Sequence, residues 1–197
     1  MFEIVLIRHA ETDNNTMHKF SGITDVGLND NGRQQALKLA DALKDEIIDH
    51  IFSSDMRRCV ETGNGLRCAN ERIFTKELRE MNFGRWENLT YKEIKERYPD
   101  DIEMWERDWT DYEIPEGESF TRMSARVIKE FEDIVKVKSN GAKKIAVVSH
   151  SGCIRTILGH YIIGSIKDSW RFRVENAAVT RLSVDKGYYF LKSLNEK

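Results

Sequence analysis

Arginine and histidine residues stand at the ends of two apolar segments that lie far apart in the sequence. Arg8 and His9 directly follow the apolar, β-branched-rich segment 2–7, and His150 directly follows the apolar segment 144–149. In open α/β sheets, ligands bind at the carboxyl ends of the strands. An arginine there offers a planar set of donors for an anion, and a histidine offers an imidazole that can attack or transfer a proton. The pattern therefore indicates an anion site at two strand ends.

Two further charged residues follow shorter candidate strands: Arg58 comes shortly after segment 50–53, and Glu80 after segment 73–74. If the strands lie side by side with right-handed crossovers, all four ends meet at one edge of the sheet. The arginines and histidines would then form an electropositive pocket for a tetrahedral oxyanion such as phosphate, and the carboxylate would supply a proton donor. Taken singly, each residue is better explained by a structural role, such as a surface ion pair or a hydrogen-bonded core histidine. Convergence at one edge favours the site.

Strands alternating with amphipathic helices are expected to position these residues. Apolar patterns predict further strands at 179–184 and 188–191, and they predict helices at 34–43, 55–62, 90–97, 101–109, 123–135 and 154–161. This alternation predicts an α/β fold, a three-layer α/β/α sandwich whose mostly parallel sheet has helices on both faces. We expect a single domain over 1–197, a functional loop over 13–31, and a helical insertion at about 89–118 that covers the site.

Composition excludes several classes of function. The 197 residues suffice for one ordinary domain, and 31 Lys+Arg against 33 Asp+Glu give a net charge of −2, which favours neither nucleic acid nor a membrane surface. The apolar segments are too short to span a bilayer, and the N-terminus enters a strand without a signal-peptide pattern, which predicts a cytoplasmic protein. The histidines and cysteines lack metal-ligand spacing, so no metal or other cofactor is expected. The predicted partner is a small phosphate ester.

Five blocks in the chain, in order, resemble the histidine phosphatase (phosphoglycerate mutase-like) superfamily. The resemblance covers nearly the whole chain, and five ordered blocks at sensible spacings are highly specific. The blocks are Arg-His-Ala-Glu-Thr at 8–12 with Asn15; Ser-Gly-Ile-Thr-Asp-Val-Gly-Leu at 21–28; Ser-Asp-Met-Arg-Arg-Cys-Val-Glu-Thr at 54–62; Leu-Arg-Glu-Met-Asn-Phe-Gly-Arg-Trp-Glu at 78–87; and Val-Val-Ser-His-Ser-Gly at 147–152.

The resemblance implies phosphoryl transfer in two steps. His9 would attack phosphorus and form a phosphohistidine, while its other ring nitrogen is held by a backbone carbonyl. Arg8, Arg58 and His150 would surround the phosphoryl oxygens, and Glu80 would protonate the leaving oxygen and then activate water. The remaining phosphate-binding positions implied by the family pattern are Asn15, Ser21, Gly22 and Ser151.

One residue departs from the family pattern, because Ala10 replaces the glycine that usually follows the nucleophile. An alanine with a positive φ would cost about 1 kcal/mol and bring its methyl group toward the phosphate, whereas with a negative φ the change would be nearly silent. This residue keeps open another class of function, a pseudo-enzyme that binds phosphorylated ligands without turnover.

Within the family, the chain most resembles the α-ribazole-5′-phosphate phosphatases of cobalamin biosynthesis, on the residues 83–87, Trp105, Asp108-Trp109 and 115–120. Trp105 and Trp109 are candidates for stacking on a benzimidazole-like ring, although packing beneath the insertion would explain them equally well. A broad-specificity phosphatase and a cofactor-dependent phosphoglycerate mutase are the alternatives. The acidic segment 100–111 would repel a second phosphate and so favours a monoester phosphatase. The oligomeric state is left open, with a homodimer as one possibility.

Overall fold

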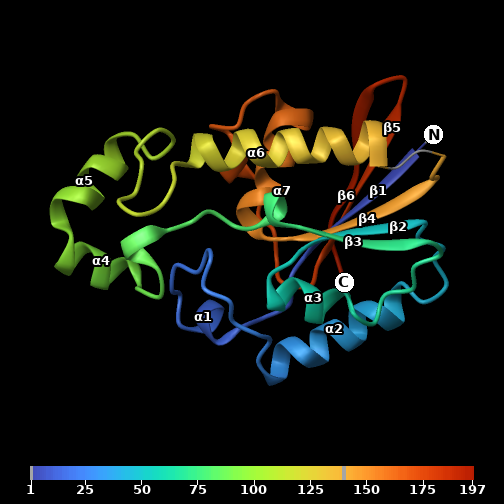
Figure 1. The fold of residues 1–197 in the computed structure, drawn as a ribbon, viewed down its shortest axis with the longest axis horizontal. Coiled ribbons are helices and arrows are strands. Elements are labelled where there is room, and N and C mark those ends of the chain that lie inside the picture. Colours follow the sequence, from blue (N-terminus) through green and yellow to red (C-terminus); the bar gives the residue numbers. More distant parts are fainter. Residues whose placement is uncertain (1, 139–140) are drawn as a thin grey trace.

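A six-stranded mixed sheet forms the centre of the molecule (Figure 1). The computed structural model describes residues 2–138 and 141–197. The strand order is β3-β2-β4-β1-β5-β6. The β1–β4, β2–β4 and β2–β3 pairs are parallel, whereas β5 is antiparallel to both β1 and β6. The strands are β1 Phe2–Arg8, β2 His50–Ser54, β3 Glu71–Thr75, β4 Lys144–Ser149, β5 Val179–Asp185 and β6 Tyr188–Glu196.

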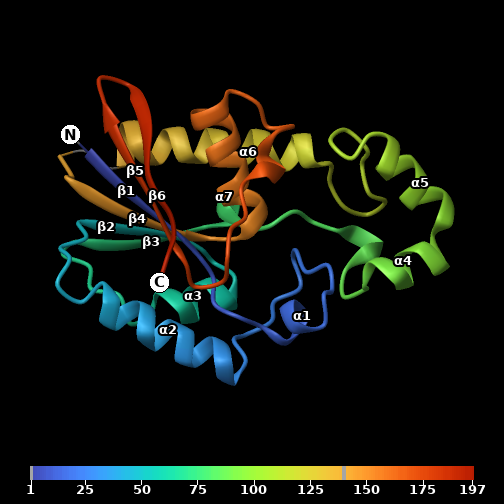
Figure 2. The same ribbon diagram turned by 180° about the vertical axis from the view of Figure 1, so that it is seen from behind.

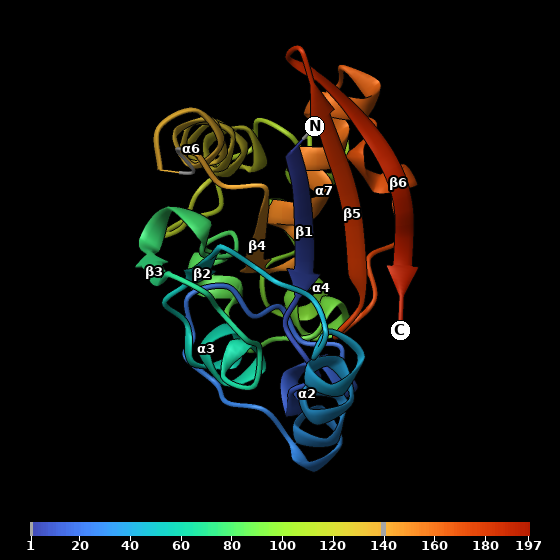
Figure 3. The same ribbon diagram turned by 90° about the vertical axis from the view of Figure 1, so that its right-hand side faces the viewer.

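Helices cover both faces of this sheet, which confirms the predicted three-layer α/β/α architecture. Helices α2 and α3 lie on one face, and α6 and α7 lie on the other (Figures 1 and 3). The helices are α1 Asp13–Thr16, α2 Asp30–Ala42, α3 Arg57–Gly63, α4 Tyr91–Arg97, α5 Pro99–Arg107, α6 Phe120–Asp133 and α7 Ser151–Leu158. None of these helices, within the residues described, is long and apolar enough to cross a membrane.

The alternation of side chains along the strands explains the two layers. On β1, Val5 and Ile7 belong to the apolar cluster under α2 and α3, while Ile4 and Leu6 belong to the cluster under α6 and α7. All four side chains are fully buried. Because successive strand residues point to opposite faces, a continuous apolar run is what a strand covered on both faces requires.

The polar segment 13–31, predicted as a loop, contains the short helix α1. Thr12 caps it, because its hydroxyl accepts a hydrogen bond from the backbone N–H of Asn15 while the Asn15 side chain accepts from the backbone N–H of Thr12. Asn29 caps α2 by accepting from Gly32 N at 2.7 Å. Four residues are too few to show helical periodicity, so only the capping residues could have indicated α1.

The segment between the short 3-10 turn at 84–86 and α6 projects beyond the carboxyl ends of the parallel strands. Helices α4 and α5 lie away from the sheet at this end of the molecule, and the chain returns from them to α6 (Figures 1 and 2). Thr90 and Glu93 form a capping box at the start of α4, and Pro99 occupies the first turn of α5. An Arg85–Asp101 ion pair ties α5 to the 84–86 turn. This arrangement places the segment beside the strand ends that carry the candidate residues.

Candidate active site

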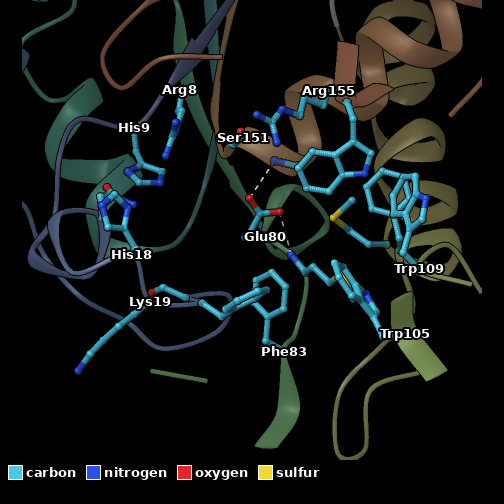
Figure 4. Close-up of a pocket in the computed structure, with 18 residues that line it drawn as sticks. Arg8, His9, His18, Lys19, Glu80, Phe83, Trp105, Trp109, Ser151 and Arg155 are labelled. Atoms are coloured by element: carbon cyan, nitrogen blue, oxygen red, sulfur yellow. Dashed lines mark hydrogen bonds between the residues drawn. The ribbon is translucent and has the colours of Figure 1, made fainter. Parts of the chain in front are cut away.

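A cavity of about 500 Å³ opens at the carboxyl ends of the central strands. Figure 4 shows Glu80 between Arg8 and His9 on one side and Trp105 and Trp109 on the other. The cavity therefore has a charged end at the sheet and an aromatic end at the helical segment. Its lining residues are Arg8, His9, Asn15, His18, Lys19, Phe20, Ser21, Glu80, Met81, Phe83, Trp105, Trp109, Phe120, Met123, Ser151, Gly152, Arg155 and Trp170.

His9 lies immediately after β1, and its imidazole is held in one orientation. Its Nδ1 donates a hydrogen bond to the Ala10 carbonyl oxygen at 2.8 Å. Because a carbonyl can only accept, Nδ1 carries the proton and Nε2 keeps its lone pair. Burial, with Arg58 and Arg8 nearby, holds the pKa of His9 well below its usual value. The ring is therefore neutral, and its free nitrogen is available as a nucleophile.

Arg58 and His150 lie behind His9 rather than on the cavity wall. The rings of His9 and His150 meet edge to face with their centroids 5.2 Å apart. His150 Nδ1 accepts a hydrogen bond from Arg58 Nε at 3.1 Å, and His150 Nε2 therefore donates to Ser54 Oγ at 3.0 Å. Burial and the charge of Arg58 lower the pKa of His150 well below its usual value, so a neutral imidazole contacts the arginine.

Arg58 also fastens the loop that follows α1. Its terminal nitrogens donate to the carbonyl oxygens of Thr24 at 3.0 Å and Gly22 at 2.7 Å. A further, longer contact from the same side chain reaches the Ser21 carbonyl oxygen at 3.5 Å, so four of the five guanidinium N–H donors, including the one to His150, have an acceptor. The fully buried cation raises the positive potential behind His9, which stabilises negative charge that develops at the cavity end.

Arg8 supplies a cation at the charged end of the cavity. One terminal nitrogen donates to the Val174 carbonyl oxygen at 2.7 Å, while its buried Nε has no hydrogen-bond partner among the described residues. Burial lowers the pKa of Arg8 to about 10, so the side chain remains a cation at neutral pH. A buried donor without a partner costs free energy until a ligand satisfies it. Arg8 is therefore suited to bind an oxyanion.

Glu80 is placed by two backbone amides. Its Oε1 accepts from Met81 N at 3.0 Å, and its Oε2 accepts from Gly152 N at 2.9 Å (Figure 4). A Cβ at position 152 would lie 2.3 Å from Glu80 Oε1, so a larger residue there would push the Glu80 carboxylate out of this position. Ser151 and Gly152 form the first turn of α7, whose N-terminus carries partial positive charge toward the same end of the cavity.

The structure separates the remaining predicted residues into two groups. Asn15 and Ser21 line the cavity, and the Asn15 oxygen accepts from Thr12 N and from Asn176 Nδ2, which turns its amide nitrogen toward other acceptors. Gly22 does not line the cavity: its N–H donates to Glu87, and its carbonyl accepts from Arg58. A Cβ on Gly22 would lie 1.7 Å from the Met81 carbonyl oxygen, so this glycine permits close backbone packing.

Several residues in or behind the cavity wall were not predicted as site residues from the sequence. Asn176 donates to both the His9 carbonyl and Asn15 Oδ1, at 3.0 and 3.1 Å. Glu87 accepts from the backbone N–H groups of residues 22–24 and from Phe83 N. Arg155 and Trp170 form part of the wall. For Glu87, its place in the fourth block was the only indication. Within the described residues, no group of three His, Cys, Asp or Glu side chains gathers that could hold a metal ion.

Ala10 adopts an ordinary backbone conformation. It is absent from the described non-glycine residues with positive φ, its N–H donates to Thr62 Oγ1 at 2.9 Å, and its methyl group packs in a small buried cluster with Leu28 and Ala177. Ala10 does not line the cavity. The backbone at Ala10 therefore does not need the positive φ that would make alanine costly, and we expect the replacement of glycine by alanine to be nearly silent here.

Replacing Ala10 with glycine is expected to change kcat/KM by less than about threefold. The substitution removes a buried methyl group and adds backbone freedom to the unfolded chain, so we expect a loss of about 1 kcal/mol in the free energy of unfolding. Steady-state kinetics and urea unfolding of the two proteins check both numbers. A rise of tenfold or more in kcat/KM would show instead that the methyl group obstructs the reaction.

Comparison with known proteins gives matches along the whole chain. A sequence profile of the histidine phosphatase superfamily (branch 1) matches residues 4–197. Phosphoglycerate mutase-like protein 4 of Arabidopsis thaliana is 37% identical over 160 residues, which cover 79% of this chain and 69% of the relative. Phosphoserine phosphatase 1 of Hydrogenobacter thermophilus is 28% identical over 197 residues, covering 99% of this chain and 92% of the relative.

Solved structures show the same fold. The crystal structure of the α-ribazole phosphatase from Shigella flexneri superposes with a TM-score of 0.90 at 26% identity, covering 99% of this chain and 96% of that one. These similar proteins carry different substrates in their names, so similarity alone does not select among a mutase-like protein, a phosphoserine phosphatase and an α-ribazole phosphatase.

Proposed function

The chain belongs to the histidine phosphatase superfamily, and we propose that it hydrolyses a phosphate monoester through a phosphohistidine formed on His9. The observation that carries this proposal is the hydrogen bond from His9 Nδ1 to the Ala10 carbonyl, which leaves Nε2 unprotonated at the charged end of the cavity. A neutral imidazole held in one tautomer needs no proton transfer before it attacks phosphorus.

In the first step, His9 Nε2 forms a bond to phosphorus while the bond from phosphorus to the leaving oxygen breaks. Arg8, the amide of Asn15 and the N-terminus of α7 stabilise the negative charge on the non-bridging oxygens. Glu80, in its protonated form, transfers a proton to the leaving oxygen. In the second step, the Glu80 carboxylate takes a proton from water as the water attacks phosphorus, and His9 is released.

We propose α-ribazole 5′-phosphate as the substrate. The aromatic end of the cavity suits a flat, apolar leaving group, because Phe83, Trp105 and Trp109 line it beyond Glu80. Both tryptophans also pack within the helical segment: Trp105 meets Trp86, and Trp109 meets Phe120 with the ring centroids 4.8 Å apart. The packing and binding explanations of these residues are therefore compatible. We propose further that the segment 89–118 covers the site and belongs to the single domain 1–197.

A phosphoglycerate mutase is the second candidate, because the relative from Arabidopsis is named mutase-like. A mutase must hold a second phosphate or carboxylate on its substrate. The residues beyond Glu80 are largely aromatic, and the nearby helix α5 carries Asp100, Asp101 and Glu103. These features favour hydrolysis of a monoester over a mutase reaction.

Phosphate release from a panel of esters, measured with a chelator present, tests the proposal. The panel contains α-ribazole 5′-phosphate, phosphoserine, 3-phosphoglycerate, fructose 2,6-bisphosphate and p-nitrophenyl phosphate. We expect kcat/KM for α-ribazole 5′-phosphate to exceed that for each other ester by at least about tenfold, as a well-matched aromatic pocket provides. Comparable slow release from all esters would replace the substrate with broad specificity. Release from none, with ligand binding retained, would leave a phosphate-binding pseudo-enzyme.

A further inference from the structure

Arg155 lies in the cavity wall between the charged end and the aromatic end. It is one turn after Ser151 and Gly152 on α7, so all three residues line the same cavity. Its Nε donates to the Phe172 carbonyl oxygen at 2.9 Å, and its guanidinium lies over the Trp170 ring, 4.6 Å from the ring centroid. A hydrogen bond on one edge and an aromatic ring below together fix the plane of the guanidinium.

The terminal nitrogens of Arg155 are not committed to any acceptor within the described part of the chain. Only its Nε has a hydrogen-bond acceptor among these residues, and no carboxylate pairs with it there. The described lining residues carry the cations Arg8, Lys19 and Arg155 but a single carboxylate, Glu80. Because Arg8 already serves the phosphoryl group, Arg155 is available to a group farther along the substrate.

The surroundings of Arg155 restrict the chemistry of that group. The rings of Trp170 and Trp109 meet edge to face with their centroids 5.4 Å apart, and Trp109 in turn contacts Phe120. Aromatic rings therefore continue from the Arg155 guanidinium to the aromatic end of the cavity. Aromatic faces carry partial negative charge and disfavour a neighbouring carboxylate, whereas they accept a flat ring. Two terminal nitrogens of a planar guanidinium match a pair of adjacent oxygen acceptors. Neutral vicinal hydroxyls followed by a flat ring satisfy both conditions.

We propose that Arg155, Trp109 and Trp170 form a subsite for a nucleoside-like leaving group. The terminal nitrogens of Arg155 donate to the 2′- and 3′-hydroxyl oxygens of a pentose, and the base lies against the two tryptophans. The cavity of about 500 Å³ lies within the range of sites that bury ligands of this size. This inference rests on the proposed function, because it requires the ester oxygen to lie at Glu80.

A cycle of enzyme and substrate changes tests the subsite. The substrates are α-ribazole 5′-phosphate, adenosine 5′-monophosphate, their 2′,3′-dideoxy analogues and p-nitrophenyl phosphate. The variants are Arg155→Gln and, as matched control, Arg122→Gln, whose arginine lies on α6 in an exposed ion pair with Glu113 outside the cavity. In the unchanged protein we expect kcat/KM for each ribose ester that is cleaved to be about 10- to 100-fold higher than for its dideoxy analogue. The analogue lacks the hydroxyl oxygens and so loses the hydrogen bonds to the charged Arg155 side chain.

We expect Arg155→Gln to reduce the ratio of kcat/KM between a ribose ester and its dideoxy analogue to about threefold or less. Its kcat/KM for p-nitrophenyl phosphate should change less than threefold. The control Arg122→Gln should leave the ratio and the kcat/KM for every ester unchanged. Trp170→Leu, which alters a half-exposed ring, should also reduce the ratio and guards against misfolding of the arginine variant. A ratio that survives in Arg155→Gln, or an equal loss on p-nitrophenyl phosphate, overturns the inference. If the ratio is found for adenosine 5′-monophosphate but not for α-ribazole 5′-phosphate, and Arg155→Gln abolishes it, the subsite stands and the α-ribazole substrate is refuted. If p-nitrophenyl phosphate is cleaved but neither nucleotide ester is, the subsite is refuted. If no ester is cleaved, the proposed phosphatase activity is refuted.

Discussion

Replacing His9 with alanine is expected to lower kcat at least about 10⁴-fold for every ester that the protein hydrolyses, because removal of a nucleophile leaves only binding and electrostatic effects. His9 Nε2 is the unprotonated ring nitrogen, and the side chains of Arg58 and His150 are oriented around its ring. No neighbouring group in the described structure reproduces that geometry. The effect should therefore appear in kcat, while inorganic phosphate still binds to Arg8.

The matched control for this variant is His18→Ala, because His18 lines the same cavity but is exposed and belongs to the loop after α1. We expect the control to lose less than about tenfold, since a surface substitution usually changes a free energy by only about 0.5 kcal/mol, or roughly twofold. Rapid quenching with labelled substrate should trap an acid-labile phosphoprotein in the unchanged protein and in His18→Ala, but not in His9→Ala. More than about 1% residual activity in a purified, folded His9→Ala protein would contradict a covalent intermediate on His9.

The architecture was predictable from the sequence because the strands buried on both faces leave continuous apolar runs. The runs before Arg8 and His150 marked the ends of β1 and β4, and these parallel neighbours do bring Arg8, His9 and His150 to one edge. Parallel strands also require a crossover, so the alternation of helices and strands indicated the layers before any contact was known.

The remainder of the cavity depends on contacts that have no local pattern. Asn176 reaches His9 and Asn15 across more than 160 positions of the chain, and Trp170 meets Arg155 from a short 3-10 turn, Ser169–Arg171. Single polar residues on irregular segments create no periodicity, and their hydrogen bonds become visible only when distant segments are placed together. For the same reason the sequence could not show that Arg58 and His150 stand behind His9 rather than on the cavity wall.

Replacing Glu80 with glutamine is expected to have the second-largest effect, and its size should depend on the leaving group. We expect kcat to fall about 10²- to 10⁴-fold for an alkyl ester such as α-ribazole 5′-phosphate, because general acid catalysis contributes this much when the leaving oxygen is basic. p-Nitrophenolate leaves without protonation, so the first step should survive. The second step still requires a base for water, and the phosphohistidine should accumulate.

The measurement for Glu80→Gln is therefore a rapid-mixing experiment that separates a burst of p-nitrophenol from the slow phase. Glu77→Gln is the control: Glu77 lies on the same segment, three residues earlier, and is exposed. Each oxygen of Glu80 accepts one backbone N–H, from Met81 and Gly152, and a glutamine amide can accept only one of them, so the side chain also loses part of its placement. Misplacement alone would slow both steps and both esters alike. A burst with p-nitrophenyl phosphate together with a much larger loss on the alkyl ester assigns both proton transfers to Glu80, whereas equal losses on the two esters and no burst would refute that role.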